Sequence, residues 1–143
     1  MPNLRIALFA TRLFITLFLL PWTLMRFTRP EAAKGVADRY YGPLGGMPDA
    51  VFLVIAILMA ALLLAFAIGF RKRISYGLVL VLHTIGTLMT IPYLIPGTEK
   101  FNILFMAALP TIGAMWLLYT LRDEDTLLSW VKRRRGLNLS VTV

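Results

Sequence analysis

One histidine and two threonines have the residue types and spacing that could support chemistry in this chain. His83 is the only histidine, and Thr87 and Thr90 follow it at four and seven residues. On a helix these three side chains share one face. Within an apolar helix, such a group can relay protons, ligate haem or hydrogen-bond a quinone. The alternative, which the sequence favours, is an interhelical hydrogen bond from a neutral imidazole.

An arginine interrupts the first apolar stretch. Arg12 lies about two turns from the start of that stretch, and the apolar stretches 6–25, 50–70, 74–98 and 101–121 contain no Asp or Glu. We therefore expect no ion pair inside the hydrocarbon, and an Arg12 side chain that extends toward the lipid headgroups. Basic pockets on the cytoplasmic side bind lipid phosphates. The candidate headgroup contacts are Arg12, Arg71, Lys72 and Arg73.

The remaining sequence lacks the patterns of an active site. There are no cysteines, which excludes disulfides, thiolate metal sites and dithiol redox chemistry. There is no supported Ser/His/Asp set, no glycine-rich phosphate loop and no metal-ligand spacing. Haem is disfavoured because a second axial ligand would have to be a methionine or come from another chain. We predict no catalytic residues, no metal and no cofactor, and we do not expect an enzyme.

Charged residues also gather in the first long loop. Two interpretations remain open for them: they line a small outward-facing pocket, or they form a solvated, self-paired surface, which is the simpler case. The residues concerned are Arg26, Arg29, Glu31, Asp38, Tyr40 and Tyr41.

The elements that position these residues are four apolar stretches. The chain is 59% hydrophobic and 15% charged, whereas soluble domains are about one quarter charged. A helix needs about 20 residues to cross a bilayer. We predict spans near 4–27, 48–70, 74–95 and 101–121, an outer loop at 28–47 with a short helix near 30–41, and a tail at 122–143. The expected fold is an all-α integral membrane four-helix bundle that forms a single domain, 1–143.

The distribution of basic residues predicts the orientation. The net charge is +8, and cytoplasmic loops of membrane proteins carry the excess of Lys and Arg. We expect both termini in the cytoplasm of a bacterium, with the protein in the inner membrane and in contact with its lipids. Nucleic-acid binding is not expected, because the membrane accounts for the charge. The basic residues of the predicted cytoplasmic side are Arg5, Arg71, Lys72, Arg73, Arg122, Lys132, Arg133, Arg134 and Arg135.

Several short motifs, in order and spacing, resemble the DoxX-like family of small four-span bacterial membrane proteins. The resemblance covers about Arg12–Leu128 and points to an uncharacterised branch; Arg26 stands where many relatives have lysine. The motifs are Arg12-Leu13-Phe14, Leu20–Phe27, Pro30-Glu31-Ala32-Ala33, Gly69–Gly77, His83-Thr84 and Leu117–Asp125.

The resemblance implies a link to membrane redox or thiol-stress systems, since the family is similar to a subunit of a thiosulfate:quinone oxidoreductase. It carries over no catalytic residue, and the lack of cysteine argues against direct thiol chemistry. Our first hypothesis is an accessory subunit of a larger inner-membrane assembly, an electron-transfer or quinone-linked complex with other integral membrane subunits. The alternative is a lipid- or quinone-binding or transport protein with a site near His83, Thr87 and Thr90.

Overall fold

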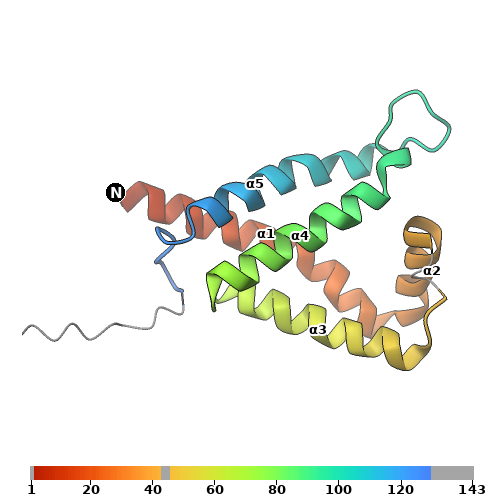
Figure 1. Ribbon diagram of the computed structural model, residues 1–143, viewed down its shortest axis with the longest axis horizontal. Coiled ribbons are helices and arrows are strands. Elements are labelled where there is room, and N and C mark those ends of the chain that lie inside the picture. The colour runs from red at the N-terminus through yellow and green to blue at the C-terminus, as the bar shows by residue number, and fades with distance from the viewer. Residues whose placement is uncertain (1, 43–45, 130–143) are drawn as a thin grey trace, which may run out of the picture.

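The computed structural model describes residues 2–42 and 46–129, and these form α-helices and no strand (Figure 1). The all-α prediction is therefore confirmed for the described residues. The basic run Lys132–Arg135 lies outside them. The elements are α1 (Pro2–Thr28), α2 (Pro30–Tyr41), α3 (Asp49–Ala67), α4 (Lys72–Met89) and α5 (Ala108–Thr120), with short 3-10 helices η2 (Ile91–Tyr93) and η3 (Ile103–Ala107).

Three helical segments of the described chain are long and apolar enough to cross a membrane. They are Asn3–Thr28, Asp49–Ala67 and Ile103–Thr120, the last of which joins η3 to α5. These segments identify a membrane protein. α4 is not among them, because its 18 residues begin with Lys72 and Arg73 and include His83, which lowers its mean hydropathy.

The long helices pack as two pairs. α1 packs mainly on α3, and α4 packs mainly on α5. The pairs meet where the first half of α1, the α3–α4 turn and the start of the tail lie together, and they diverge toward α2 (Figure 1). We call these the tail end and the α2 end. α2 begins at Pro30, where a proline suits the first turn of a helix, and lies where the sequence predicts a short helix.

The core follows one stripe on each helix. In the first half of α1 the buried side chains are Leu8, Arg12 and Ile15, which are spaced by four and three residues as one helical face requires. They meet a core cluster formed by Phe66, Tyr76, Val79, Leu80, Met115 and Leu118. Large apolar side chains such as Phe14, Leu64 and Trp116 lie exposed on the opposite faces, where lipid is a suitable solvent.

The turn between α3 and α4 is a Schellman motif that a glycine makes possible. Gly69 N–H donates to the Phe66 carbonyl at 3.0 Å, and Phe70 N–H donates to the Ala65 carbonyl at 2.8 Å. Gly69 has a φ of +64°, a conformation that favours glycine. The chain therefore reverses within a few residues, and α4 starts beside the end of α3.

Candidate functional site

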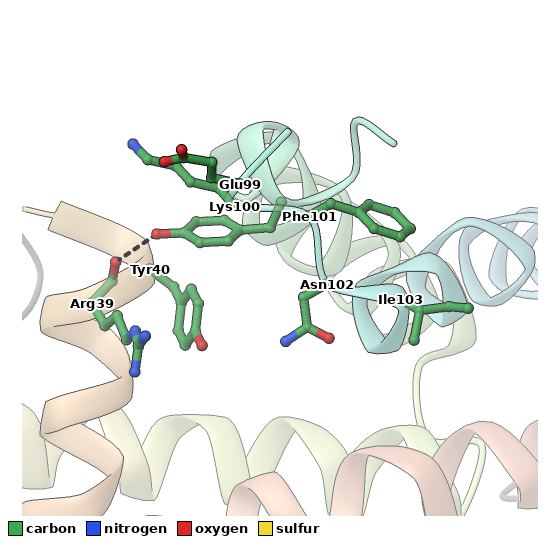
Figure 2. A pocket seen from close by; sticks show the side chains of 8 residues that line it. Arg39, Tyr40, Glu99, Lys100, Phe101, Asn102 and Ile103 are labelled. Carbon is green, nitrogen blue, oxygen red and sulfur yellow. Dashed lines mark hydrogen bonds between the residues drawn. The ribbon is translucent and has the colours of Figure 1, made fainter. Parts of the chain in front are cut away.

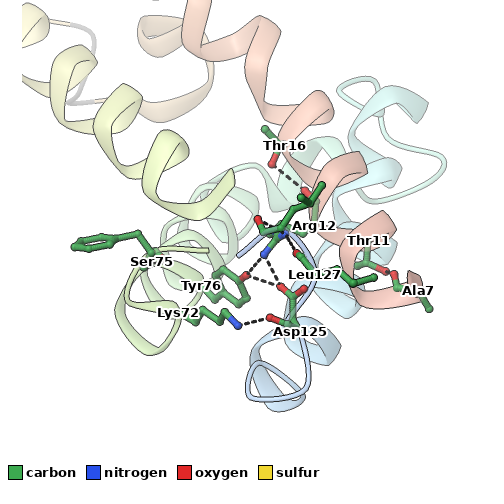
Figure 3. A network of polar contacts seen from close by, with 11 residues as sticks. Ala7, Thr11, Arg12, Thr16, Lys72, Ser75, Tyr76, Asp125 and Leu127 are labelled. Atoms are coloured by element: carbon green, nitrogen blue, oxygen red, sulfur yellow. Dashed lines mark hydrogen bonds and ion pairs between the residues drawn. The ribbon is translucent and has the colours of Figure 1, made fainter. Parts of the chain in front are cut away.

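A buried network of polar side chains lies at the tail end. The Arg12 side chain is 1% exposed, and its Nη1 donates to Asp125 Oδ2 at 2.9 Å and to the Tyr76 hydroxyl at 3.1 Å (Figure 3). The Tyr76 hydroxyl itself donates to Asp125 Oδ2 at 2.6 Å, and the Asp125 side chain is fully buried. A carboxylate, a phenol and a guanidinium thus form a closed triangle.

Further contacts bring in the backbone of the tail. Arg12 Nη2 donates to the carbonyl of Leu127 at 2.6 Å and to that of Leu128 at 3.2 Å. The Lys72 ammonium donates to the backbone carbonyl of Asp125. We call Arg12, Lys72, Tyr76 and Asp125 the Arg12 network. It joins α1, the start of α4 and the segment after α5.

The expectation that Arg12 extends to the headgroups without an acidic partner is wrong. The acid lies four residues beyond the predicted fourth span, in a segment that folds back over the bundle. An unpaired buried charge is costly, whereas a paired and hydrogen-bonded one is tolerated. The guanidinium therefore points at protein acceptors. The proposed lipid contacts of Arg71, Lys72 and Arg73 stay a prediction.

The α3–α4 turn approaches this network closely. A Cβ atom on Gly69 would lie 2.6 Å from Arg12 Nη1 and 2.8 Å from Ser129 Cβ. Glycine is therefore required at this position for two reasons: the backbone has a positive φ, and the Arg12 guanidinium occupies the space that a Cβ atom would need. The Asp125 Oδ1 and Ser129 Oγ atoms are buried and have no hydrogen-bond partner among the described residues.

His83 lies midway along α4 and faces the interior. Its ring meets Phe18 of α1 edge-on with the ring centroids 6.0 Å apart, and it also lies near the backbone of Ala108 in α5. Nε2 is buried and has no partner among the described residues. The imidazole therefore keeps one unused hydrogen-bonding atom between three helices.

The two threonines of the predicted site are both buried, Thr87 in the last turn of α4 and Thr90 directly after α4. The Thr87 hydroxyl donates to the His83 carbonyl at 2.8 Å, and the Thr90 hydroxyl donates to the Thr87 carbonyl at 2.9 Å. The structure thus aligns the three predicted residues, but the two hydroxyl protons are used by the backbone of their own helix. Only the imidazole has an unpartnered donor or acceptor atom.

A third polar region lies at the α2 end, and the sequence predicts only part of it. A hollow of about 770 Å³ is lined by residues of α2, η2, η3 and the connection between α4 and α5 (Figure 2). Tyr40 is the only member of the predicted loop cluster among its lining residues; Arg26, Arg29, Glu31 and Asp38 are not. We call this the α2-end hollow; its lining residues are Arg39, Tyr40, Tyr93, Glu99, Lys100, Phe101, Asn102 and Ile103.

Aromatic packing connects α2 to the α4–α5 connection. The ring of Tyr40 lies 4.9 Å from that of Tyr93 and 5.0 Å from that of Phe105, and the Tyr93 hydroxyl donates to the Arg39 carbonyl at 3.3 Å. Aromatic pairs in this range of centroid distances are stabilising. Beside them, burial raises the pKa of the Tyr41 hydroxyl, and the positive charge of Arg26 opposes that shift. Tyr41 is therefore neutral at pH 7.

The arrangement of these side chains cannot be compared with that in a known relative. A comparison with protein-family models finds no match, and comparisons with curated proteins and with solved structures find none either. The resemblance to the DoxX-like family therefore stays a prediction. What can be concluded about the chain rests on its own geometry: a helical membrane protein with a buried polar network that contains an ion pair at one end and a hollow lined by polar side chains at the other.

Proposed function

We propose that the chain crosses the bacterial inner membrane four times, with α4 as the remaining span and both termini in the cytoplasm. The Arg12 network supports this topology, because it brings the first half of α1, the start of α4 and the segment after α5 to the same end of the bundle. An even number of crossings puts these segments on one side. Arg5, Arg71, Arg73 and Arg122 add positive charge to that end, as expected for a cytoplasmic side.

Single cysteines test the topology, since the chain contains none. Asp38 at the α2 end and Asp123 at the tail end are both exposed. In intact cells whose outer membrane has been made permeable, a membrane-impermeant maleimide should label Asp38→Cys and leave Asp123→Cys unlabelled until the inner membrane is lysed. Equal labelling of both variants in intact cells would contradict the proposal.

Within that topology, the chain acts as an accessory subunit of a larger inner-membrane assembly, linked to electron transfer or quinones as the DoxX-like resemblance implies. One contrast carries this proposal. Inside the bundle Arg12, Tyr76 and Asp125 bond to one another, whereas the long helices present large apolar side chains outward. A surface of this kind interacts through packing with other helices and with lipid.

Purification from native membranes tests the accessory role. The tagged full chain, expressed at its natural level and extracted in a mild detergent, should migrate on native gels as a larger assembly containing other membrane proteins. Chemical cross-linking before extraction controls for partners that associate only in detergent. A single small particle in both procedures would contradict the proposal.

A second candidate function has its own observation. The buried Nε2 of His83 has no partner among the described residues, and the Phe18 ring lies beside it. A quinone carbonyl could accept a hydrogen bond there while its ring packs on Phe18. Decylubiquinone should then raise the Tm of the purified protein, and His83→Leu should abolish that increase. Thr84→Val is the matched control, since the Thr84 hydroxyl bonds the Leu80 carbonyl.

A further inference from the structure

The α2-end hollow presents three hydrogen-bond donors to one space. The Arg39 guanidinium, the Tyr40 hydroxyl and the Asn102 amide lie on the same side of the hollow in Figure 2, while Glu99 and Lys100 lie at the opposite rim. The donors come from α2 and from the residue that precedes η3. Segments distant in sequence thus contribute to one polar site.

The orientation of the Asn102 amide follows from its role in the backbone. Asn102 Oδ1 accepts a hydrogen bond from Leu104 N–H at 3.0 Å and so caps η3. The oxygen is therefore committed, and the NH₂ group remains for the hollow. This assignment makes Asn102 a donor toward any bound group.

The other two donors are also available. Among the described residues, no acidic side chain lies within ion-pair distance of the Arg39 guanidinium, whose only ring contact is with Tyr40 at 5.7 Å. The Tyr40 hydroxyl makes no hydrogen bond with any described residue, although its ring packs on Tyr93 and Phe105. One positive charge and two neutral donors thus face the same space.

An apolar wall lies beside the donors. Tyr93, Phe101 and Ile103 supply the apolar part of the lining. The Tyr93 ring also stacks on Phe105, which is not a lining residue, with the centroids 5.5 Å apart. Small-molecule sites commonly have volumes of about 300–1,000 Å³ and combine an apolar lining with a few polar groups. The α2-end hollow has both properties, at the end of a bundle whose sides are apolar.

We propose that the α2-end hollow binds the phosphate ester of a membrane phospholipid. A guanidinium and two neutral donors on one side of the hollow favour an oxygen anion there, and hydrogen bonds between a guanidinium and phosphate are stronger than neutral ones. The glycerol and first acyl carbons of the lipid pack against Tyr40, Tyr93 and Ile103. Glu99 and Lys100 carry opposite charges and add no net charge at their rim. The proposal holds whether or not the chain is an accessory subunit.

Three probes distinguish the sources of such a ligand. The purified, delipidated full chain is titrated with dihexanoyl phosphatidylglycerol, with dihexanoylglycerol and with glycerol 3-phosphate. We expect the phospholipid to bind at least about tenfold more tightly than dihexanoylglycerol, because a charge-assisted hydrogen bond is lost with the phosphate. Glycerol 3-phosphate binding as tightly as the lipid would support the phosphate site and assign it a soluble ligand. Equal binding of dihexanoylglycerol would overturn the proposal.

Two substitutions locate the binding. Arg39→Gln removes the positive charge, and Asn102→Asp keeps the Oδ1 atom that caps η3 while replacing the NH₂ donor with a carboxylate oxygen. Each should weaken phosphatidylglycerol binding about tenfold and leave Tm unchanged. Arg29→Gln, which removes an exposed charge outside the hollow, is the matched control and should bind as the natural chain does. If both Arg39→Gln and Asn102→Asp bind phosphatidylglycerol as tightly as the natural chain does, the proposed site is refuted. Because Arg39 is exposed, its substitution does not endanger the fold.

Discussion

The two ends of the bundle both gather polar side chains, but they use them differently. At the tail end, Arg12 and Tyr76 direct their donors at Asp125 and at tail carbonyls, and helices from both pairs meet around them. At the α2 end the pairs diverge, and the side chains of Arg39, Tyr40 and Asn102 face a hollow. Polar groups that bond one another hold a fold together, whereas polar groups that lack partners are free to bind a ligand.

If the tail end is structural, the largest loss of stability should follow from leaving its charge unpaired. Arg12→Met leaves the Asp125 carboxylate buried without its cation, so unfolding should require about 3–5 kcal/mol less. Denaturation in detergent micelles measures this difference. Arg5→Met, which removes an exposed arginine from the same helix, is the control.

The double variant Arg12→Met/Asp125→Leu sharpens the same test. Because it removes both charges, it should recover most of the stability that Arg12→Met loses. If the double variant is less stable than the single one by a further 2 kcal/mol or so, the ion pair is not the cause of the loss.

Gly69→Ala should have the next largest effect. Its Cβ atom would collide with Arg12 Nη1 and Ser129 Cβ, and its φ of +64° disfavours a side chain. We expect a loss of about 2 kcal/mol in the free energy of unfolding. Gly113→Ala is the matched substitution in α5, where a Cβ atom meets open space; it should be neutral or stabilise by up to about 1 kcal/mol. Equal effects of the two substitutions would show that the close approach at Gly69 is unimportant.

Tyr76→Phe should have a smaller effect. It removes the hydroxyl that donates to Asp125 Oδ2 at 2.6 Å but keeps the ring packed on Phe66. The expected loss is about 1–2 kcal/mol, the contribution of a hydrogen bond to a charged group. Tyr119→Phe serves as control, since the Tyr119 hydroxyl makes no hydrogen bond with the described residues. A loss below the measurement error for Tyr76→Phe would mean that Arg12 alone satisfies the carboxylate.

His83→Leu should change stability least. The substitution removes an imidazole whose Nε2 has no partner among the described residues, and the Ala108 backbone contact is the only polar contact that it loses. Removing a buried nitrogen that has no partner favours the folded state, whereas losing the Ala108 contact disfavours it. We therefore expect the free energy of unfolding to change by no more than about 1 kcal/mol. A loss of stability as large as that of Arg12→Met would show that His83 stabilises the fold as the Arg12 network does. The contrast between that network and the other polar groups would then fail.

The sequence predicts the helical architecture better than it predicts the contacts. Apolar stretches with short basic or glycine-rich connections indicate the long helices, and Pro30 with Glu31 marks the start of α2. Charge within an apolar stretch is a strong local signal, so the sequence alone marks Arg12 as unusual. Its partner could not be found by searching the spans, because the tail residues that cover it gain their positions only from the folded bundle.

One available signal would have improved the prediction for Arg12. Leu8, Arg12 and Ile15 share a helical face, which places the arginine among core residues. On an almost uniformly apolar helix that face cannot be distinguished from the others by periodicity, because all faces look hydrophobic. The α2-end hollow has a similar explanation. Asn102 and Arg39 lie far apart in sequence, and nothing in the pattern of either segment indicates that both line one hollow.

The ion pair between Arg12 and Asp125 also constrains how the protein is made. The two residues are separated by 113 positions, so a ribosome that adds about 5–20 residues per second finishes the carboxylate about 6–23 s after the arginine. During that interval the arginine of the first helix lacks its acidic partner. Synthesis of the segment after α5, rather than of any one helix, is therefore the step that gives the buried arginine its acidic partner.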